Sequence, residues 1–211
     1  MLKLFRASSL ADIMTDPKGK DEILSVGAKS AVTKMAKEFI YGYTETVSSK
    51  YMEKGIRVED QSIQLLNSVL FTGFVKNEER RNNEWITGEA DIVGSDRIID
   101  IKSSWSLGTF PVLASEGADK KYEWQGRAYM MLWDKPKFEI AYCMVSTPDD
   151  LIGYEQKSMH QVDAIDRALR VTLVTYERDL ALEEKIKIKV NAARAYLEQT
   201  IEQITKEHTH G

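Results

Sequence analysis

The sequence predicts an α/β sandwich, an α/β/α arrangement in which helices cover both faces of a mixed central β-sheet. Three observations support this prediction: apolar residues recur at helical spacing before residue 70, strand-like runs follow between residues 84 and 146, and a long segment rich in Ala, Glu, Lys and Leu comes last. Helices before, within and after a small group of strands favour a layered α/β fold. The 211 residues suffice for one compact domain. We therefore expect a single domain over residues 1–211.

The N-terminal part of this domain, residues 8–70, is predicted to be helical. Residues 8–14 have serines before apolar residues and predict a short capped helix. Pro17 and Gly19 indicate a loop at residues 15–20. A longer helix is expected at residues 21–43, where the apolar positions with helical spacing are Ile23, Leu24, Ala28, Val32, Met35, Ala36 and Ile40. A further helix is expected at residues 48–69.

The central part, residues 84–146, begins with a predicted hairpin. Residues 85–93 alternate between apolar and polar side chains, residues 94–96 contain the Gly94 and Ser95 of a tight turn, and residues 97–102 form a second apolar run. A loop with Gly and Pro is expected at residues 103–118, followed by a helix at 120–133 and a strand at 138–145.

The C-terminal part, residues 170–206, is predicted to be one strand and one long helix. Residues 161–169, which precede it, have the spacing of a helix. The strand is expected at residues 170–176, where Val, Thr, Leu and Tyr dominate. Residues 178–206 are rich in strong helix formers and complete the fold.

Composition and charge exclude several classes of protein. The net charge is −4 and the pI is near 5.5, which disfavours a protein that coats nucleic acid by charge alone. Cys143 is the one cysteine, so an intrachain disulfide is excluded and a reducing compartment is expected. No apolar run is long enough to span a membrane, and the N-terminus lacks the apolar stretch of a secretory signal. We expect a cytoplasmic protein.

The strongest chemical feature is a pair of aspartates and a lysine on the predicted hairpin. Asp91 and Asp100 stand on opposite sides of the turn, where pairing of the two strands brings their side chains together. Asp100 and Lys102 are two residues apart on one strand and project from the same face. Two carboxylates suit Mg²⁺, and a lysine beside them can orient water or neutralise developing charge. The alternative interpretation is a hairpin whose charges simply face solvent.

These residues resemble the signature of the PD-(D/E)XK nuclease superfamily. Gly88 and Asp91 match its Gly-x-x-Asp element, and Asp100 and Lys102 match its Asp-x-Lys element. Upstream, Gly55 and Glu59 are similar to the Gly-x-x-x-Glu pattern by which a helix of the superfamily supplies another acid, although Asp60 and Glu53 share that helix. Downstream, the Gln-x-x-x-Tyr pattern of the RecB-like and lambda-exonuclease-like branches is matched by Gln125 and Tyr129.

The resemblance implies a role for each matched residue. Mg²⁺, with Mn²⁺ as a substitute, is expected to be held by Asp91, Asp100 and Ile101, with Glu59 bound directly or through water. Lys102 would assist the attacking water. The full set of expected catalytic residues is Glu59, Asp91, Asp100, Lys102, Gln125 and Tyr129.

The N-terminus is similar to the opening of lambda-exonuclease-like and YqaJ-like viral recombinases, in which hydroxyls and arginines hold a DNA 5′-phosphate. This resemblance suggests DNA contacts at Arg6, Ser8 and Ser9, although a plain helix cap explains the serines equally well. Further candidate phosphate contacts, which are equally well explained as surface charges, are Lys120, Lys121 and Arg127.

The branch implies a Mg²⁺-dependent exonuclease that digests double-stranded DNA ends in the 5′→3′ direction during phage-type recombination. Such enzymes commonly form ring-shaped trimers and work with a single-strand annealing protein, so a homo-oligomer in a bacterial or phage-infected cell is expected. Two alternatives stay open at this point. One is a RecB-like or structure-selective endonuclease with the same site, and the other is a catalytically silent nuclease fold that only binds DNA.

Overall fold

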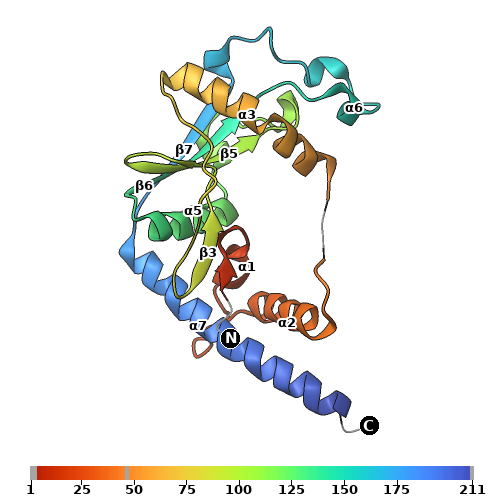
Figure 1. The fold of residues 1–211 in the computed structure, drawn as a ribbon, viewed down its shortest axis with the longest axis vertical. Helices are drawn as coiled ribbons and strands as arrows, with labels where there is room; N and C mark the ends of the chain where they lie inside the picture. Colours follow the sequence, from red (N-terminus) through yellow and green to blue (C-terminus); the bar gives the residue numbers. More distant parts are fainter. Residues whose placement is uncertain (1–3, 46–47, 210–211) are drawn as a thin grey trace.

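The structure is a computed structural model that describes residues 4–45 and 48–209. Its larger sheet has four strands in the order β4 (Ile92–Val93), β5 (Arg97–Ser103), β6 (Lys137–Cys143) and β7 (Val171–Glu177). β4 and β5 are antiparallel, β5 and β6 are parallel, and β6 and β7 are antiparallel. The prediction of an α/β fold with a mixed sheet is confirmed (Figure 1).

Two helices cover the opposite faces of this sheet, and alternation along β5 explains why. Ile99 and Ile101 point to one face and join a buried cluster with residues of α3 (Lys50–Leu70). Ile98 points to the other face and packs in the main core with Tyr129 and Met130 of α5 (Lys120–Trp133). The even-numbered residues of β5, which include the predicted acid and lysine, therefore lie on the α5 face.

A second, smaller sheet lies beside the first, with the strand order β1 (Phe5–Arg6), β3 (Ile86–Glu89) and β2 (Arg80–Asn82). β1 is parallel to β3, and β2 is antiparallel to it. The prediction of one strand over residues 85–93 is wrong, because the chain changes sheet at Ala90 and Asp91 and continues as β4. β1 and β2 were not predicted; they are short, and all three residues of β2 are exposed.

The N- and C-terminal helices pack against each other below the two sheets (Figure 1). After β1 the chain forms the short helices η1 (Ala7–Ser9) and α1 (Ala11–Met14). α2 (Val26–Tyr41) begins later than predicted, because the side chain of Ser25 caps it by accepting a hydrogen bond from the Ala28 N–H. The long α7 (Leu180–Thr209) lies along α2, and the main core draws residues from Phe5 to Leu197.

The remaining segments are mostly short helical turns. The loop predicted at residues 103–118 begins at Ser104, because Ser103 still belongs to β5, and it contains the turns η2 (Leu107–Thr109) and α4 (Ala114–Gly117). Between β6 and β7 lie α6 (Asp149–Ile152), η3 (Lys157–Met159) and η4 (Arg167–Leu169). The prediction of a helix at residues 161–169 is therefore wrong apart from the η4 turn. Over the described ranges, no helix combines the length and apolar character that a membrane span requires.

Candidate active site

The two predicted aspartates meet at the open end of the β4–β5 hairpin. The register pairs Ile92 with Ile99 and Val93 with Ile98, so that Asp91 and Asp100 occupy the next opposed positions. The carboxylate of Asp91 accepts a hydrogen bond from the main-chain N–H of Ile101, at 2.7 Å from Oδ2. This bond fixes Asp91 immediately before the first residue of β4, where it belongs to neither sheet.

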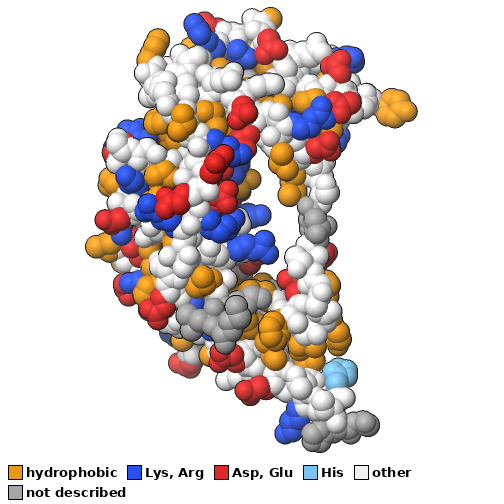
Figure 2. Space-filling view, in the orientation of Figure 1, with side chains coloured by type: hydrophobic (Ala, Val, Ile, Leu, Met, Phe, Trp, Pro, Cys, Tyr) orange, Lys and Arg blue, Asp and Glu red, His pale blue; other side chains and the backbone are white. Residues whose placement is uncertain are grey.

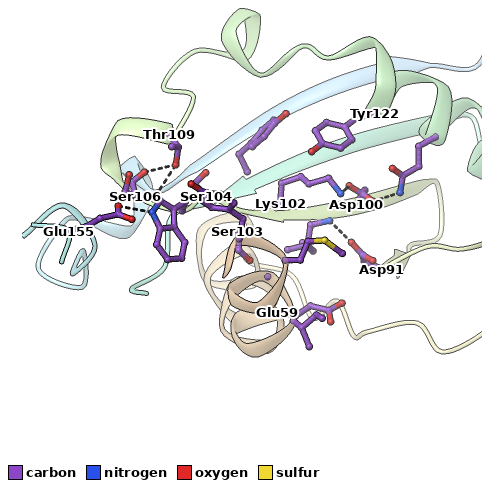
Figure 3. A pocket seen from close by; sticks show the side chains of 18 residues that line it. Glu59, Asp91, Asp100, Lys102, Ser103, Ser104, Ser106, Thr109, Tyr122 and Glu155 are labelled. Atoms are coloured by element: carbon purple, nitrogen blue, oxygen red, sulfur yellow. Dashed lines mark hydrogen bonds and ion pairs between the residues drawn. The ribbon is translucent and has the colours of Figure 1, made fainter. Parts of the chain in front are cut away.

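A cleft of about 890 Å³ opens over this end of the hairpin (Figure 3). It brings together five of the six residues predicted to be catalytic, which come from α3, the hairpin and α5. These residues are Glu59, Asp91, Asp100, Lys102 and Gln125, and the predicted metal-binding residue Ile101 also lines the cleft. Beyond Lys102 the cleft continues along Ser103, Ser104 and Trp105 (Figure 3).

Tyr129, the sixth residue, reaches the acids through Gln125. The amide Nε2 of Gln125 donates to Oδ1 of Asp100 at 2.9 Å and lies 3.0 Å from the Tyr129 hydroxyl. That hydroxyl donates to the carbonyl of Glu89 at 2.9 Å. Gln125 and Tyr129 lie on one face of α5 and therefore orient a carboxylate and join α5 to β3.

Two glycines explain how α5 comes so close to both sheets. A Cβ on Gly88 would lie only 2.8 Å from the ring of Tyr129 and 3.0 Å from the Cβ of Ala7. A Cβ on Gly126 would overlap the ring of Phe138 on β6, at 1.9 Å. The Gly-x-x-Asp element thus has a packing function, because its glycine lets Tyr129 reach the main chain next to the acids.

Lys102 is the cation that faces the acid pair. Its ammonium forms an ion pair with Oδ2 of Asp100, which is 2% exposed. The ammonium also lies 4.6 Å from the centre of the Tyr122 ring, which lines the same cleft. Burial alone would lower the pKa of Lys102, but the charge and hydrogen bond of Asp100 outweigh burial and raise it.

The two acids are buried close together, and this disfavours the charged form of Asp91. Burial, followed by the charge of Asp100, raises the pKa of Asp91 to about 7, although the Ile101 N–H and Lys102 act in the opposite direction. Within the described part of the chain, the ion pair with Lys102 is the one polar contact of Oδ2 of Asp100. Two neighbouring carboxylates, each able to accept more bonds than these contacts supply, are a donor set that fits Mg²⁺ or Mn²⁺.

Glu59 lies on α3 on the other side of the cleft from Lys102 (Figure 3). Its carboxylate forms an ion pair with Lys76. Over residues 4–45 and 48–209, no group of three or more His, Cys, Asp and Glu side chains is placed to hold a metal ion. Mg²⁺ commonly retains several waters, so a cation bound by Asp91 and Asp100 would need few further protein ligands. Direct binding by Glu59 stays a prediction.

The predicted DNA contacts occupy several different environments. Arg6, Ser8 and Ser9 are exposed, and the η1 turn that contains the serines packs on α5 and β3 near Gly88. Lys120 and Lys121 are exposed at the start of α5.

Arg127 differs from the other candidates, because it is only 8% exposed. Its guanidinium donates to the carbonyl of Glu177 and to the carboxylate of Glu123, and it lies over the ring of Tyr176. These internal contacts leave Arg127 a structural part of the α5–β7 interface.

Sequence reasoning missed Tyr122 and Lys76, two residues that contact predicted site residues. Tyr122, which contacts Lys102, is one helical turn before Gln125 on α5, and that spacing is the signal that would have identified it. Lys76, which pairs with Glu59, lies in an irregular segment between α3 and β2, where no periodic pattern predicts its position.

This fold, with a carboxylate pair and a lysine converging in one cleft, is that of the PD-(D/E)XK nuclease superfamily. No protein-family model and no curated protein sequence matches the chain. Among solved structures the chain is similar to a phage-related exonuclease from Haemophilus somnus 129PT, with 38% sequence identity, a TM-score of 0.90 and coverage of 97% of each chain. The chain belongs to this family of phage-related exonucleases, in the lambda-exonuclease-like and YqaJ-like viral recombinase branch.

A more distant similarity concerns the fold. An alkaline exonuclease from Laribacter hongkongensis shares 20% identity with the chain at a TM-score of 0.69, and a second structure of that exonuclease, in complex with dAMP, has a TM-score of 0.70. In each case the match covers 99% of this chain and 95% of the other.

Proposed function

We propose that this protein is a metal-dependent exonuclease that digests double-stranded DNA from its ends in the 5′→3′ direction. The observation that carries the proposal is the convergence of Asp91, Asp100 and Lys102 in one cleft, in a chain 38% identical to a phage-related exonuclease. The structure of the Laribacter hongkongensis exonuclease with dAMP supports a nucleotide as the group that such a cleft holds.

The cleft residues divide the chemistry among them. Asp91, Asp100 and the Ile101 carbonyl would hold Mg²⁺ or Mn²⁺, and Glu59 would bind it directly or through water. Bound there, the cation supplies a water molecule of lowered pKa and neutralises charge on the phosphate and the leaving oxygen. Lys102 orients the attacking water or stabilises the charge that develops on the phosphate.

The other residues hold these groups in place. The Gln125 amide donates a hydrogen bond to Oδ1 of Asp100 and so fixes the orientation of that carboxylate. Tyr129 in turn holds the Gln125 amide against β3. Such contacts keep the reacting groups in one geometry, which accounts for much of the rate that an enzyme gains from positioning.

The shape and charge of the surface agree with a DNA substrate. The net charge is −4, yet the space-filling view shows a hollow between the part that holds α5 and the part that holds α2, with Lys and Arg side chains projecting into it (Figure 2). Local basic side chains can attract DNA although the whole protein is acidic. We further propose that Arg6, Ser8 and Ser9 contact the DNA end, with Lys120 and Lys121 contacting phosphates nearby.

The family resemblance extends the proposal to assembly and to the cellular setting. Enzymes of this branch commonly form ring-shaped trimers and act with a single-strand annealing protein. We propose the same for this protein, in the cytoplasm of a bacterial or phage-infected cell.

The proposal is tested by incubating the protein with 5′-labelled linear duplex DNA and with covalently closed circles, in Mg²⁺ and in EDTA. We expect Mg²⁺-dependent loss of linear DNA only, with the 5′ label released first. Lys102→Ala should reduce this rate by about 10²–10³-fold, the usual effect of removing one group that stabilises transition-state charge. Lys157→Ala is the control, since Lys157 is exposed and pairs with Asp149 outside the cleft.

The same assay separates the alternatives. If the protein cuts closed circular DNA, it is an endonuclease and the proposal is wrong. If the protein binds DNA and does not cleave it, it is a catalytically silent DNA-binding protein. A fully active Lys102→Ala variant would contradict the mechanism.

A further inference from the structure

The segment between α3 and β2 is held against the catalytic hairpin by specific hydrogen bonds. At its start, the side chain of Asn67 accepts from the Phe74 N–H and donates to the Phe74 carbonyl, both at 2.8 Å. At its end, the main-chain N–H of Asn77 donates to the Asp91 carbonyl at 2.7 Å, and its side chain donates to the Ala90 carbonyl at 2.9 Å. The segment is therefore attached directly to the main chain of a proposed metal ligand.

These bonds place Lys76 beside the acidic side of the cleft. Lys76 immediately precedes Asn77, and its ammonium pairs with Oε2 of Glu59. The hydrogen bond that Lys76 donates to Glu59 raises the pKa of Lys76 most, burial opposes it, and the charges of Glu59, Asp91 and Asp60 raise the pKa further. The side chain of Lys76 is 46% exposed and that of Glu59 is 20% exposed. The Glu59 carboxylate is thus the less accessible partner, and the lysine lies toward solvent.

We propose that Lys76 is a second active-site cation with two successive partners. In the absence of a divalent ion, Lys76 neutralises the charge of Glu59. When Glu59 binds a divalent ion, Lys76 instead contacts a phosphate of the bound DNA. This inference rests on the proposed function and extends it. Its physical basis is that an ammonium and a metal ion compete for one carboxylate, while the bonds of Asn67 and Asn77 keep the ammonium next to the cleft.

An ordinary surface ion pair does not explain this arrangement equally well. Such a pair contributes little to stability and needs no defined backbone. Here the adjoining Asn77 is bonded to the main chain of Ala90 and Asp91, and the partner carboxylate lines the cleft. An exposed pair such as Lys157 and Asp149, by contrast, lies outside the cleft and serves as the matched control.

The first test measures Mn²⁺ affinity by titration calorimetry on DNA-free protein. Lys76→Met should bind Mn²⁺ about two- to fivefold more tightly than the wild type, the range that corresponds to losing one partly exposed ion pair. Lys157→Met should leave the affinity unchanged. In a Glu59→Gln background the effect of Lys76→Met should disappear, because the shared carboxylate is absent. Unchanged Mn²⁺ affinity in Lys76→Met would overturn the competition between lysine and metal.

The second test measures binding of a 5′-phosphorylated duplex in Mg²⁺ at several salt concentrations, in a Lys102→Ala background in which cleavage is slow enough for binding to be measured. Lys76→Met should weaken binding and reduce the slope of log affinity against log salt by about one, as expected for one lost phosphate contact. Lys76→Arg should restore the slope. An unchanged slope in Lys76→Met would overturn the phosphate contact.

These outcomes are distinct from failure of the proposed function. If wild-type protein leaves linear DNA intact in Mg²⁺, the nuclease assignment fails whatever Lys76 does. If the wild type digests DNA and Lys76→Met matches it in Mn²⁺ affinity and salt slope, only the role of Lys76 fails. Equal thermal stability of the variants confirms that each one is folded.

Discussion

Lys54 carries a buried ammonium, and its partners among the described residues are main-chain carbonyls. It is 1% exposed, and its Nζ donates to the carbonyls of Ser104, Trp105 and Val145. It therefore ties α3 to the segments that follow β5 and β6, and the first of these segments lines the cleft at Ser104 and Trp105. Burial lowers the pKa of Lys54 to about 8.

The lowered pKa of Lys54 predicts how stability depends on pH. Between about pH 8 and the ordinary value of 10.5, the unfolded chain holds this proton and the folded chain releases it, so the contribution of Lys54 to stability rises with pH. The difference between the two pKa values corresponds to about 3 kcal/mol. Urea unfolding of the wild type and of Lys54→Met should therefore give free energies that diverge in favour of the wild type from pH 7.5 to pH 10. Parallel profiles would show that the Lys54 pKa is not lowered.

The residues of the site differ in how far the sequence could predict them. Asp91, Asp100 and Lys102 were predictable because strand geometry is regular, so opposed and alternate residues share a face. The pairing of Gln125 with Asp100 needed a tertiary contact between α5 and β5, which helical spacing alone does not specify. Lys76 was not predictable, since its place depends on hydrogen bonds between an irregular segment and the hairpin.

At the scale of elements, α3 contains a glycine that its packing does not require. Gly55 lines the cleft, and a Cβ at this position would meet no heavy atom within 4 Å. A glycine inside a helix costs about 1 kcal/mol relative to alanine. Gly126 of α5 differs from Gly55, because the ring of Phe138 leaves no room for a side chain at position 126. Packing therefore requires the glycine at position 126 and not the one at position 55.

Substituting these two glycines should have opposite effects on stability. Gly55→Ala should raise the free energy of unfolding by about 0.5–1 kcal/mol while weakening DNA binding, because the added methyl group occupies part of the cleft. Gly126→Ala should lower the free energy by about 1–3 kcal/mol through overpacking against Phe138. Denaturant unfolding and duplex binding measure the two effects. If Gly55→Ala is more stable and binds DNA as well as the wild type, the glycine does not make room for substrate.

The elements with long regular patterns were predictable, and the elements defined by tertiary contacts were not. α3, α5 and α7 have clear helical composition and lie close to their predicted ranges. Residues 161–169 suggested a helix because Val162 and Ile165 have helical spacing, but both pack in a small cluster under a loop, and Asp166 caps only a 3₁₀ turn. The division of residues 85–93 between two sheets follows from hydrogen bonds with other segments, which no local pattern marks.

At the scale of the whole molecule, binding of a divalent ion should be linked to folding. Asp91 and Asp100 come together only when the hairpin is folded, so an ion bound between them stabilises the folded chain over the unfolded one. At ten times its dissociation constant, an ion adds about 1.4 kcal/mol, which raises the melting temperature by about 3–6 °C in a protein of this size. Thermal unfolding in Mg²⁺ or Mn²⁺, compared with EDTA, measures this shift. The melting temperature of Asp100→Asn should be the same with and without the ions. If neither ion changes the melting temperature of the wild type, the proposed metal site is contradicted.

The connection from β3 to β4 limits how the length of this chain can vary. Three consecutive residues are each bonded to a different neighbour: the Glu89 carbonyl to Tyr129, the Ala90 carbonyl to Asn77, and the Asp91 carboxylate to Ile101. An insertion or deletion here would break at least one of these bonds, because no slack exists to absorb it. Related chains should therefore tolerate length changes in segments such as residues 104–118, whereas the interval from Gly88 to Asp91 keeps a constant length.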